Sequence, residues 1–279
     1  MMQNLTELIT NALQEDLGSR GDVTSLATIS ESSRGSAKIY AKAPGIIAGC
    51  FVVEKVYSIV DSTLDVDVLI DDGSAVVPGQ DVIRMRGAMR SILIGERIAL
   101  NYLCRLSGIA TMTSEFVKQT NGTGVKIMDT RKTTPGIRSL EKYAVRSGGG
   151  TNHRSGLYDM FLIKENHIAA AGGITNAVTL AREYNKRNRI DLKIEVETRN
   201  LDEVKEALHL EVDRIMLDNM TTEQVKEAVA IVNKGIKLEI SGGITLDNIK
   251  KYADTGVDYI SIGGLTHSAR ALDLSLLVE

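Results

Sequence analysis

Two segments of the chain combine cations with hydroxyl and backbone donors, a combination suited to binding anions. Residues 129–136 read Asp-Thr-Arg-Lys-Thr-Thr-Pro-Gly, so Arg131 and Lys132 stand among three hydroxyl groups. Arginine can hold a carboxylate or a phosphate with two parallel hydrogen bonds, and lysine adds a point charge. Residues 146–154 contain three consecutive glycines followed by His153 and Arg154, and glycine lets backbone amides converge on an anion. Together the segments predict an anion site, although each alone could be a solvated loop.

Three further charged residues each end an apolar run. Lys164 follows Phe-Leu-Ile, where it could form a Schiff base, bind an anion or pair with a nearby glutamate. Glu197 and Asp218 end the next two runs. Carboxylates there could bind Mg²⁺, act as acid and base, or balance nearby cations, and the spacing does not choose among these roles.

Glycine pairs end the last two apolar runs. They lie in Ser241-Gly242-Gly243 and in Gly263-Gly264, with His267 just beyond. Loops after late strands of α/β barrels often bind phosphate, and glycine allows the backbone to approach it closely. The whole set predicts a polyanionic, phosphorylated ligand together with Mg²⁺.

Six short apolar runs must position these residues. They cover residues 126–128, 160–163, 192–196, 214–217, 238–240 and 259–262, with helical stretches such as 201–208, 222–232 and 246–254 between them. Strands that alternate with helices imply a parallel sheet, whose carboxyl ends form the ligand-binding edge. Six units are too few for a complete eight-stranded barrel. The pattern therefore favours a shortened barrel, with an open doubly wound sheet as the alternative.

The first part of the chain has a different pattern. Residues 5–13 predict a helix that stops at Gly18, residues 36–43, 64–70 and 82–85 predict strands, and residues 50–60 predict a helix. These elements indicate a small α+β domain. A long helical pattern follows over 89–119, with a possible break at Gly108, and it places Arg97 and Arg105 among apolar residues. A charge there needs a partner or a route to water.

Composition excludes several classes of protein. The 279 residues carry a net charge of −3 and 4% aromatic residues with no tryptophan, which argues against a nucleic-acid surface. The two cysteines are far apart, and no His-Cys cluster has the spacing of a metal site. We find no apolar run of membrane-spanning length and no signal-peptide pattern at the start, so we expect a cytoplasmic protein with no membrane partner.

Over nearly its whole length the chain resembles the quinolinate phosphoribosyltransferase family. The resemblance rests on DTRKTTPGIR (129–138), KYAVRSGGGTNHR (142–154), LIKENHI (162–168), EVET (195–198), LDN (217–219), SGGI (241–244) and GGLTHS (263–268). In the first half it rests on EDLGSRGDVTS (15–25) and GERIALNYLCRLSGIAT (95–111). Two positions depart from the family pattern, Ser147 where cysteine is expected and Gly264 where alanine or another residue is common.

The resemblance implies an α/β protein of two domains. An N-terminal α/β sandwich-like domain would cover residues 1–107, and a six- or seven-stranded TIM-like α/β barrel would cover 108–266. The tail 267–279 would pack on the first domain. The implied reaction joins quinolinate to 5-phosphoribosyl 1-diphosphate with Mg²⁺ and gives nicotinate mononucleotide, diphosphate and CO2 in de novo NAD biosynthesis.

The resemblance also implies roles for single residues. The substrate-binding set would be Arg97, Thr130, Arg131, Lys132, His153, Arg154, Lys164, Glu197, Asp218, Ser241, Gly242, Gly243, Gly263, Gly264 and His267. Of these, Arg131, His153, Arg154 and Lys164 would hold the two carboxylates of quinolinate. Arg97 would come from a neighbouring subunit of a homodimer or hexamer. Lys132 would contact the donor, Glu197 and Asp218 its ribose hydroxyls and Mg²⁺-linked groups, and the glycines with Ser241 its 5-phosphate. Lys132, Lys164, Glu197 and Asp218 would be the catalytic residues.

Three other functions compete with this interpretation. A paralogue of the same fold, such as the relatives associated with molybdenum transport, would use another acceptor, and the intact set of Arg131, His153, Arg154 and Lys164 argues against it. A Schiff-base aldolase would use Lys164 as its nucleophile. A binding or regulatory barrel would keep the anion site without turnover.

Overall fold

A computed structural model describes residues 5–279. The chain forms two compact units. The first contains the residues up to Ser114 together with 139–149 and 268–279, and the second contains 115–138 and 150–267. Among the described residues, no helix has both the length and the apolar character needed to span a membrane.

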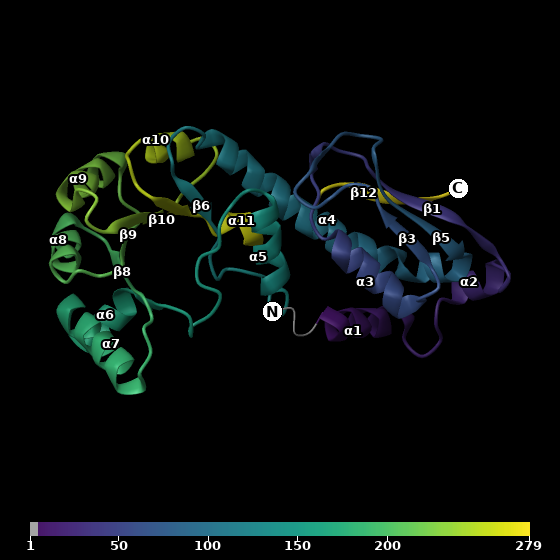
Figure 1. Ribbon diagram of the computed structural model, residues 1–279, viewed down its shortest axis with the longest axis horizontal. Helices are drawn as coiled ribbons and strands as arrows, with labels where there is room; N and C mark the ends of the chain where they lie inside the picture. The colour runs from purple at the N-terminus through teal and green to yellow at the C-terminus, as the bar shows by residue number, and fades with distance from the viewer. Residues whose placement is uncertain (1–4) are drawn as a thin grey trace. The chain divides into compact units, whose positions relative to one another are not determined.

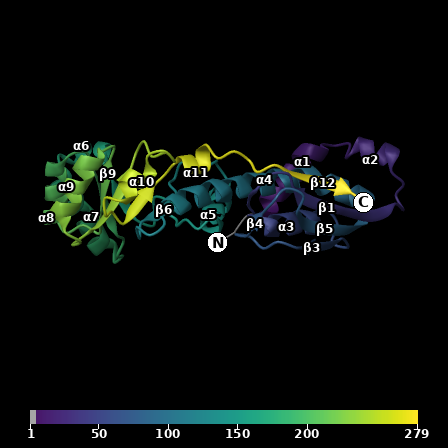
Figure 2. The same ribbon diagram turned by 90° about the horizontal axis from the view of Figure 1, so that it is seen from above.

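The first unit is built on a four-stranded antiparallel sheet. The strands are β1 Arg34–Ala41, β3 Asp65–Val68, β5 Asp81–Ala88 and β12 Leu274–Val278, in the order β12-β1-β5-β3. Strand β12 lies beside β1 in both views (Figure 1, Figure 2), with Leu276 opposite Ile39. A two-stranded sheet pairs β2 Gly45–Ile46 with β4 Ala75–Val76. The last residues of the chain thus complete a sheet begun by the first.

Helices complete the first unit. They are α1 Leu5–Leu17, α2 Val23–Thr28, α3 Cys50–Val60, most of α4 Met89–Gln119 and nearly all of α5 Arg138–Ser147. The apolar side of α3 is buried, and the hydroxyl of the fully buried Tyr57 donates to the backbone oxygen of Ile92 at 3.1 Å. These elements confirm the predicted strands and the predicted helix over 50–60.

The predicted break at Gly108 is wrong, because α4 runs unbroken through it. A side chain at this position would collide with the backbone oxygen of Arg270 in the C-terminal tail. Glycine at 108 therefore permits close packing of the tail on the helix and does not end the helix.

The second unit is a six-stranded parallel sheet. Its strands are β6 Lys126–Met128, β7 Phe161–Ile163, β8 Ile194–Thr198, β9 Arg214–Asp218, β10 Lys237–Ser241 and β11 Tyr259–Ser261, in the order β6-β11-β10-β9-β8-β7. Strands β7 to β11 lie in chain order and β6 follows β11, whereas a doubly wound sheet reverses its order at a switch point. Among the described residues β6 and β7 do not pair with each other, and Thr151 makes an isolated bridge to Met128. The predicted shortened barrel is confirmed, with six strands.

Helices follow the strands of the second unit. They are α6 Glu165–Ala171, α7 Ile174–Asn188, α8 Leu201–His209, α9 Thr222–Val232, α10 Ile249–Ala253 and α11 Gly264–His267. Helix α8 packs against β8 and β9, and α9 packs against α8 (Figure 1). Asn200 caps α8 by accepting from two backbone amides, and Thr221 caps α9 by accepting from the backbone amide of Gln224.

The strand register decides which side chains face the interior. Glu197 lies opposite Met216, and Ser241 lies opposite both Asp218 and Ser261. Because side chains alternate between the two faces of a strand, these residues share one face. That face also carries the residues two positions earlier on each strand, including Glu195, Arg214 and Glu239.

Candidate active site

A pocket of about 910 Å³ opens at the carboxyl ends of the strands in the second unit. Its volume lies within the range of about 300–1,000 Å³ that is usual for small-molecule sites. The predicted residues that line it are Thr130, Arg131, Lys132, His153, Arg154, Lys164, Glu197, Asp218, Ser241, Gly242, Gly243, Gly263, Gly264 and His267. Arg97 does not line the pocket; it lies on α4 in the first unit, with a side chain that is 63% exposed.

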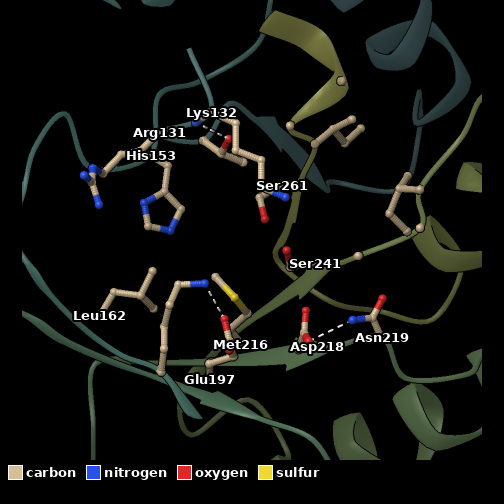
Figure 3. Close-up of a pocket in the computed structure, with 18 of the residues that line it drawn as sticks. Arg131, Lys132, His153, Leu162, Glu197, Met216, Asp218, Asn219, Ser241 and Ser261 are labelled. Carbon is tan, nitrogen blue, oxygen red and sulfur yellow. Dashed lines mark hydrogen bonds and ion pairs between the residues drawn. The ribbon is translucent and has the colours of Figure 1, made fainter. Parts of the chain in front are cut away.

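The cations of the pocket come from two loops that are tied together. Arg131 and Lys132 follow β6, while His153 and Arg154 precede β7, and Figure 3 shows Arg131, Lys132 and His153 on one side of the pocket. Arg138 joins the loops, because its guanidinium donates to the Thr133 hydroxyl at 2.9 Å and to a backbone oxygen of the second loop at 2.9 Å. The two anion-binding segments predicted from sequence are thus held as one wall.

Arg154 is the most enclosed of the guanidinium groups in this wall. It is half-buried, and its Nη1 donates to the backbone oxygen of Met160 at 3.0 Å. Burial, followed by the nearby charge of Arg131, lowers the pKa of Arg154 below its ordinary value. Two crowded guanidinium groups favour an anion between them.

The acidic side of the pocket lies across from these cations. Figure 3 shows Glu197 and Asp218 there, and Lys164 reaches Glu197 with 2.6 Å between Nζ and Oε2. Burial raises the pKa of Glu197, and its hydrogen bond to Glu165 raises it further. One oxygen of Asp218 accepts a hydrogen bond from Asn219 at 2.8 Å. The ion pair that was one alternative for Lys164 is therefore present, within the pocket.

Oxygen donors on this side fit a hard cation. Glu197 and Asp218 offer carboxylates, the ligands that Mg²⁺ prefers, and they lie at the ends of neighbouring strands β8 and β9. Lys164 already neutralises much of the Glu197 charge. The donor set therefore suits an ion that keeps most of its waters and its substrate ligands.

Glycines shape the far end of the pocket. Gly242 and Gly243 have φ values of 95° and 63°, in the left-handed region that glycine enters without strain. A side chain at Gly242 would collide with Asn219, whereas the space beside Gly243 is open within 4 Å. Thr266 in α11 donates to the backbone oxygen of Lys132 at 2.8 Å, which ties the glycine end to the cationic loop.

A buried charged cluster lies on the same inward face and was missed by sequence reasoning. Nε2 of His153 lies 3.2 Å from Glu195 and 3.4 Å from Glu239, and Arg214 lies 2.8 Å from Glu239. The available signal was a charge two positions before two of the pocket residues, Glu239 before Ser241 and Glu195 before Glu197.

His167 has a local structural role. Its Nδ1 accepts the backbone N–H of Lys164 at 3.0 Å and so caps the start of α6. This contact fixes the backbone of Lys164 at the pocket edge.

Comparisons with known proteins agree with this geometry. The family described as "Quinolinate phosphoribosyl transferase, N-terminal domain" matches residues 22–107, and the corresponding C-terminal domain family matches 109–277. A protein of Bacillus subtilis named probable nicotinate-nucleotide pyrophosphorylase [carboxylating] is 43% identical over 98% of this chain and 92% of its own length. A chloroplastic nicotinate-nucleotide pyrophosphorylase of Oryza sativa is 42% identical over 99% of this chain and 78% of its own length.

A solved structure extends the similarity to three dimensions. The nicotinate-nucleotide pyrophosphorylase from Francisella tularensis has a TM-score of 0.94 and 40% sequence identity, covering 99% of this chain and 96% of its own. Sequence and structure agree over both units. The chain belongs to the quinolinate phosphoribosyltransferase family, the decarboxylating phosphoribosyltransferases of de novo NAD biosynthesis.

Proposed function

We propose that the pocket of the second unit binds quinolinate and 5-phosphoribosyl 1-diphosphate side by side and joins them. The observation that carries this proposal is a single cavity with a cationic wall, an acidic wall and a glycine-shaped end. The cationic wall matches a dicarboxylate, and the acidic wall matches a ribose with its metal-linked diphosphate. The glycine-shaped end matches a phosphate monoester.

Arg131, Arg154 and Lys164 hold the two carboxylates of quinolinate. Two guanidinium groups can each grip one carboxylate bidentately, and Lys164 turns toward the substrate from its ion pair with Glu197. His153 lines the pocket between the loops and belongs to the same set. Arg97 adds a further cation from a second subunit; its side chain on α4 is exposed and lies 3.6 Å from Glu96 of its own chain.

The donor occupies the remaining part of the pocket. Lys132 contacts its diphosphate, while Glu197 and Asp218 contact the ribose hydroxyls and the waters of Mg²⁺. Thr130 supports this loop, because its hydroxyl accepts the backbone N–H of Lys132 at 3.0 Å. Ser241, Gly242, Gly243, Gly263 and Gly264 surround the 5-phosphate, and His267 lies beside it. Mg²⁺ neutralises the diphosphate when bound.

The chemistry has two steps. The pyridine nitrogen attacks the anomeric carbon, the bond from that carbon to the diphosphate oxygen breaks, and its electron pair leaves with diphosphate. The fixed carboxylates of Glu197 and Asp218 stabilise the positive charge that develops on the ribose. The new pyridinium then accepts the electrons of the adjacent carbon–carboxylate bond as CO2 leaves, and a proton replaces the carboxylate.

We also propose the domain division at residues 107 and 108, with the barrel ending at 266. The two family matches meet between 107 and 109, which supports that boundary. A homodimer or hexamer and a cytoplasmic location stay predictions, and the Oryza sativa relative is named as chloroplastic.

The test is diphosphate release with quinolinate as acceptor and nicotinate as the matched control. Quinolinate should support turnover and nicotinate should not, because nicotinate lacks the carboxylate that neutralises the second cation. Equal turnover of both acceptors would favour the paralogue. Covalent trapping of Lys164 by borohydride in the presence of substrate would favour an aldolase instead.

A further inference from the structure

The inward face of the barrel carries a buried charged layer directly beneath the pocket. Glu195, Arg214 and Glu239 come from the three adjacent strands β8, β9 and β10. Both glutamates have 0% exposed side chains, and that of Arg214 is 18% exposed. Charged groups are rarely placed so deep unless they compensate one another, so the layer calls for a physical reason.

His153 links this layer to the pocket wall. Its Nε2 lies 3.2 Å from Oε2 of Glu195 and 3.4 Å from Oε1 of Glu239. Its Nδ1 accepts the backbone N–H of Arg154 at 2.7 Å. An acceptor at Nδ1 places the ring proton on Nε2, facing the two carboxylates. The ring therefore has one fixed orientation, set by acids on one side and by the backbone of Arg154 on the other.

The charges around the imidazole come from four elements. Glu195 on β8 and Glu239 on β10 face Nε2, and Arg214 on β9 lies between them, 2.8 Å from Glu239 and 3.8 Å from Glu195. On the pocket side the neighbouring charge is Arg154. Buried Asp129, at the end of β6, accepts the backbone N–H of His153 at 2.9 Å.

The acids favour a proton on this cluster. Burial lowers the pKa of His153 and the interactions with Glu195 and Glu239 raise it. Because the backbone N–H of Arg154 can only donate, Nδ1 carries no proton and the ring is neutral, with its one proton on Nε2. Burial, followed by the charge of Glu239, raises the pKa of Glu195. The cluster therefore retains protons at neutral pH and leaves little net charge under the pocket.

The same donor atoms could in principle hold a metal ion, since His153, Glu195 and Glu239 offer ligand atoms within 4.8 Å of one another. Arg214 argues against this, because its guanidinium lies against both carboxylates and a second cation would be repelled. Arg214 also stacks on the ring of Tyr259, with 4.3 Å from its central carbon to the ring centre, which fixes its position.

We propose that Glu239 is a positioning residue for quinolinate binding and acts through His153. Its carboxylate contacts Nε2 and fixes the orientation of the imidazole. Nδ1 of the imidazole accepts the backbone N–H of Arg154, and this contact keeps the guanidinium of Arg154 facing the pocket. This inference rests on the proposed function of the pocket. Glu239 does not line the pocket and touches no substrate. Loss of its carboxylate therefore weakens quinolinate binding indirectly, because Arg154 is held less firmly against one carboxylate of quinolinate.

The test compares Glu239→Gln with Asp258→Asn. Asp258 is a matched control, since it accepts from the backbone of β10 at 2.9 Å and pairs with Lys237 but does not line the pocket. Glu239→Gln should raise KM for quinolinate about tenfold or more, because small displacements of a binding group are costly. Its kcat and its KM for the phosphoribosyl donor should stay close to those of the wild type. Asp258→Asn should lower the melting temperature without this selective change.

A double-mutant cycle with His153→Ala separates the proposed route from general loosening of the barrel. If Glu239 acts through His153, Glu239→Gln should add little to KM for quinolinate once the imidazole is gone. Full additivity of the two changes would overturn the proposal, as would equal rises in KM for both substrates. Tightly bound zinc that is lost in Glu239→Gln would overturn it in favour of a metal site. Wild-type protein without quinolinate turnover would instead contradict the proposed function, so the two failures are distinguishable.

Discussion

Arg154 and Arg131 should not contribute equally to quinolinate binding, although both are arginines of the same wall. Arg154 is half-buried, with a pKa lowered first by burial and then by Arg131, whereas Arg131 is exposed. Replacing each by alanine removes one guanidinium from the substrate. The difference in exposure sets how strongly water screens the lost interaction.

The magnitudes follow from Coulomb's law. Two unit charges about 4 Å apart attract by about 4 kcal/mol at the effective dielectric of a partly buried site, and by about 1 kcal/mol in bulk water. One factor of ten in affinity corresponds to about 1.4 kcal/mol. Arg154→Ala should therefore lower kcat/KM for quinolinate by up to about 1,000-fold, and Arg131→Ala by about 5-fold.

Steady-state kinetics with quinolinate varied at saturating donor provides the measurement. Arg199→Ala is the matched control, because Arg199 directly follows β8, pairs with Glu203 at 3.2 Å, and does not line the pocket. Calorimetry with the donor alone should show nearly unchanged binding in Arg154→Ala. Equal losses in the two variants, or a larger loss in Arg131→Ala, would refute the reasoning from burial.

Four further predictions follow from the structure and the proposed assembly. A mixture of inactive Arg97→Ala and Arg154→Ala subunits should regain part of the activity, since some hybrids contain one intact site; hybrids without recovery would refute the shared site. A chelator should abolish diphosphate release and Mg²⁺ should restore it, and full activity in metal-free enzyme would contradict this. Gly108→Ala should lower the free energy of unfolding in urea by about 1–3 kcal/mol, because the C-terminal tail must shift to make room for the methyl group. An unchanged urea midpoint would contradict this close packing of the tail on α4. Asp22→Ala should lower it by about 1 kcal/mol through loss of a helix cap. Because hydrogen bonds, first that of Ser25, lower the pKa of Asp22, this difference should persist at pH 7 and vanish as the pH falls through that lowered value.

The strands of the barrel were predictable from sequence because each is a short apolar run between helices. Their polar endings are equally visible in the sequence, which places Glu197 and Asp218 at the same edge of the predicted sheet. The alternative of a doubly wound sheet stayed open at that stage. Strand order depends on contacts between distant segments, which local periodicity does not encode.

The buried cluster was harder to predict. Glu239 stands between Leu238 and Ile240, and a charge between two apolar residues of a strand gives no sign of which distant group compensates it. His153 reaches it from a loop more than eighty residues earlier in the chain. The continuity of α4 through Gly108 was missed for the same reason, since the residue that requires a glycine there is Arg270 in the tail.

The pairing of β12 with β1 has a consequence for the order in which the molecule can fold during synthesis. Residues 274–278 complete the sheet that residues 34–41 begin, so the entire barrel lies between two neighbouring strands in the chain. The barrel strands leave the ribosome before β12 does and pair only among themselves, so they can assemble first. Until β12 arrives, β1 is an exposed strand edge, open to pairing with other chains. The N-terminal unit, although synthesised first, is therefore completed last, and the edge of β1 stays exposed to aggregation until then.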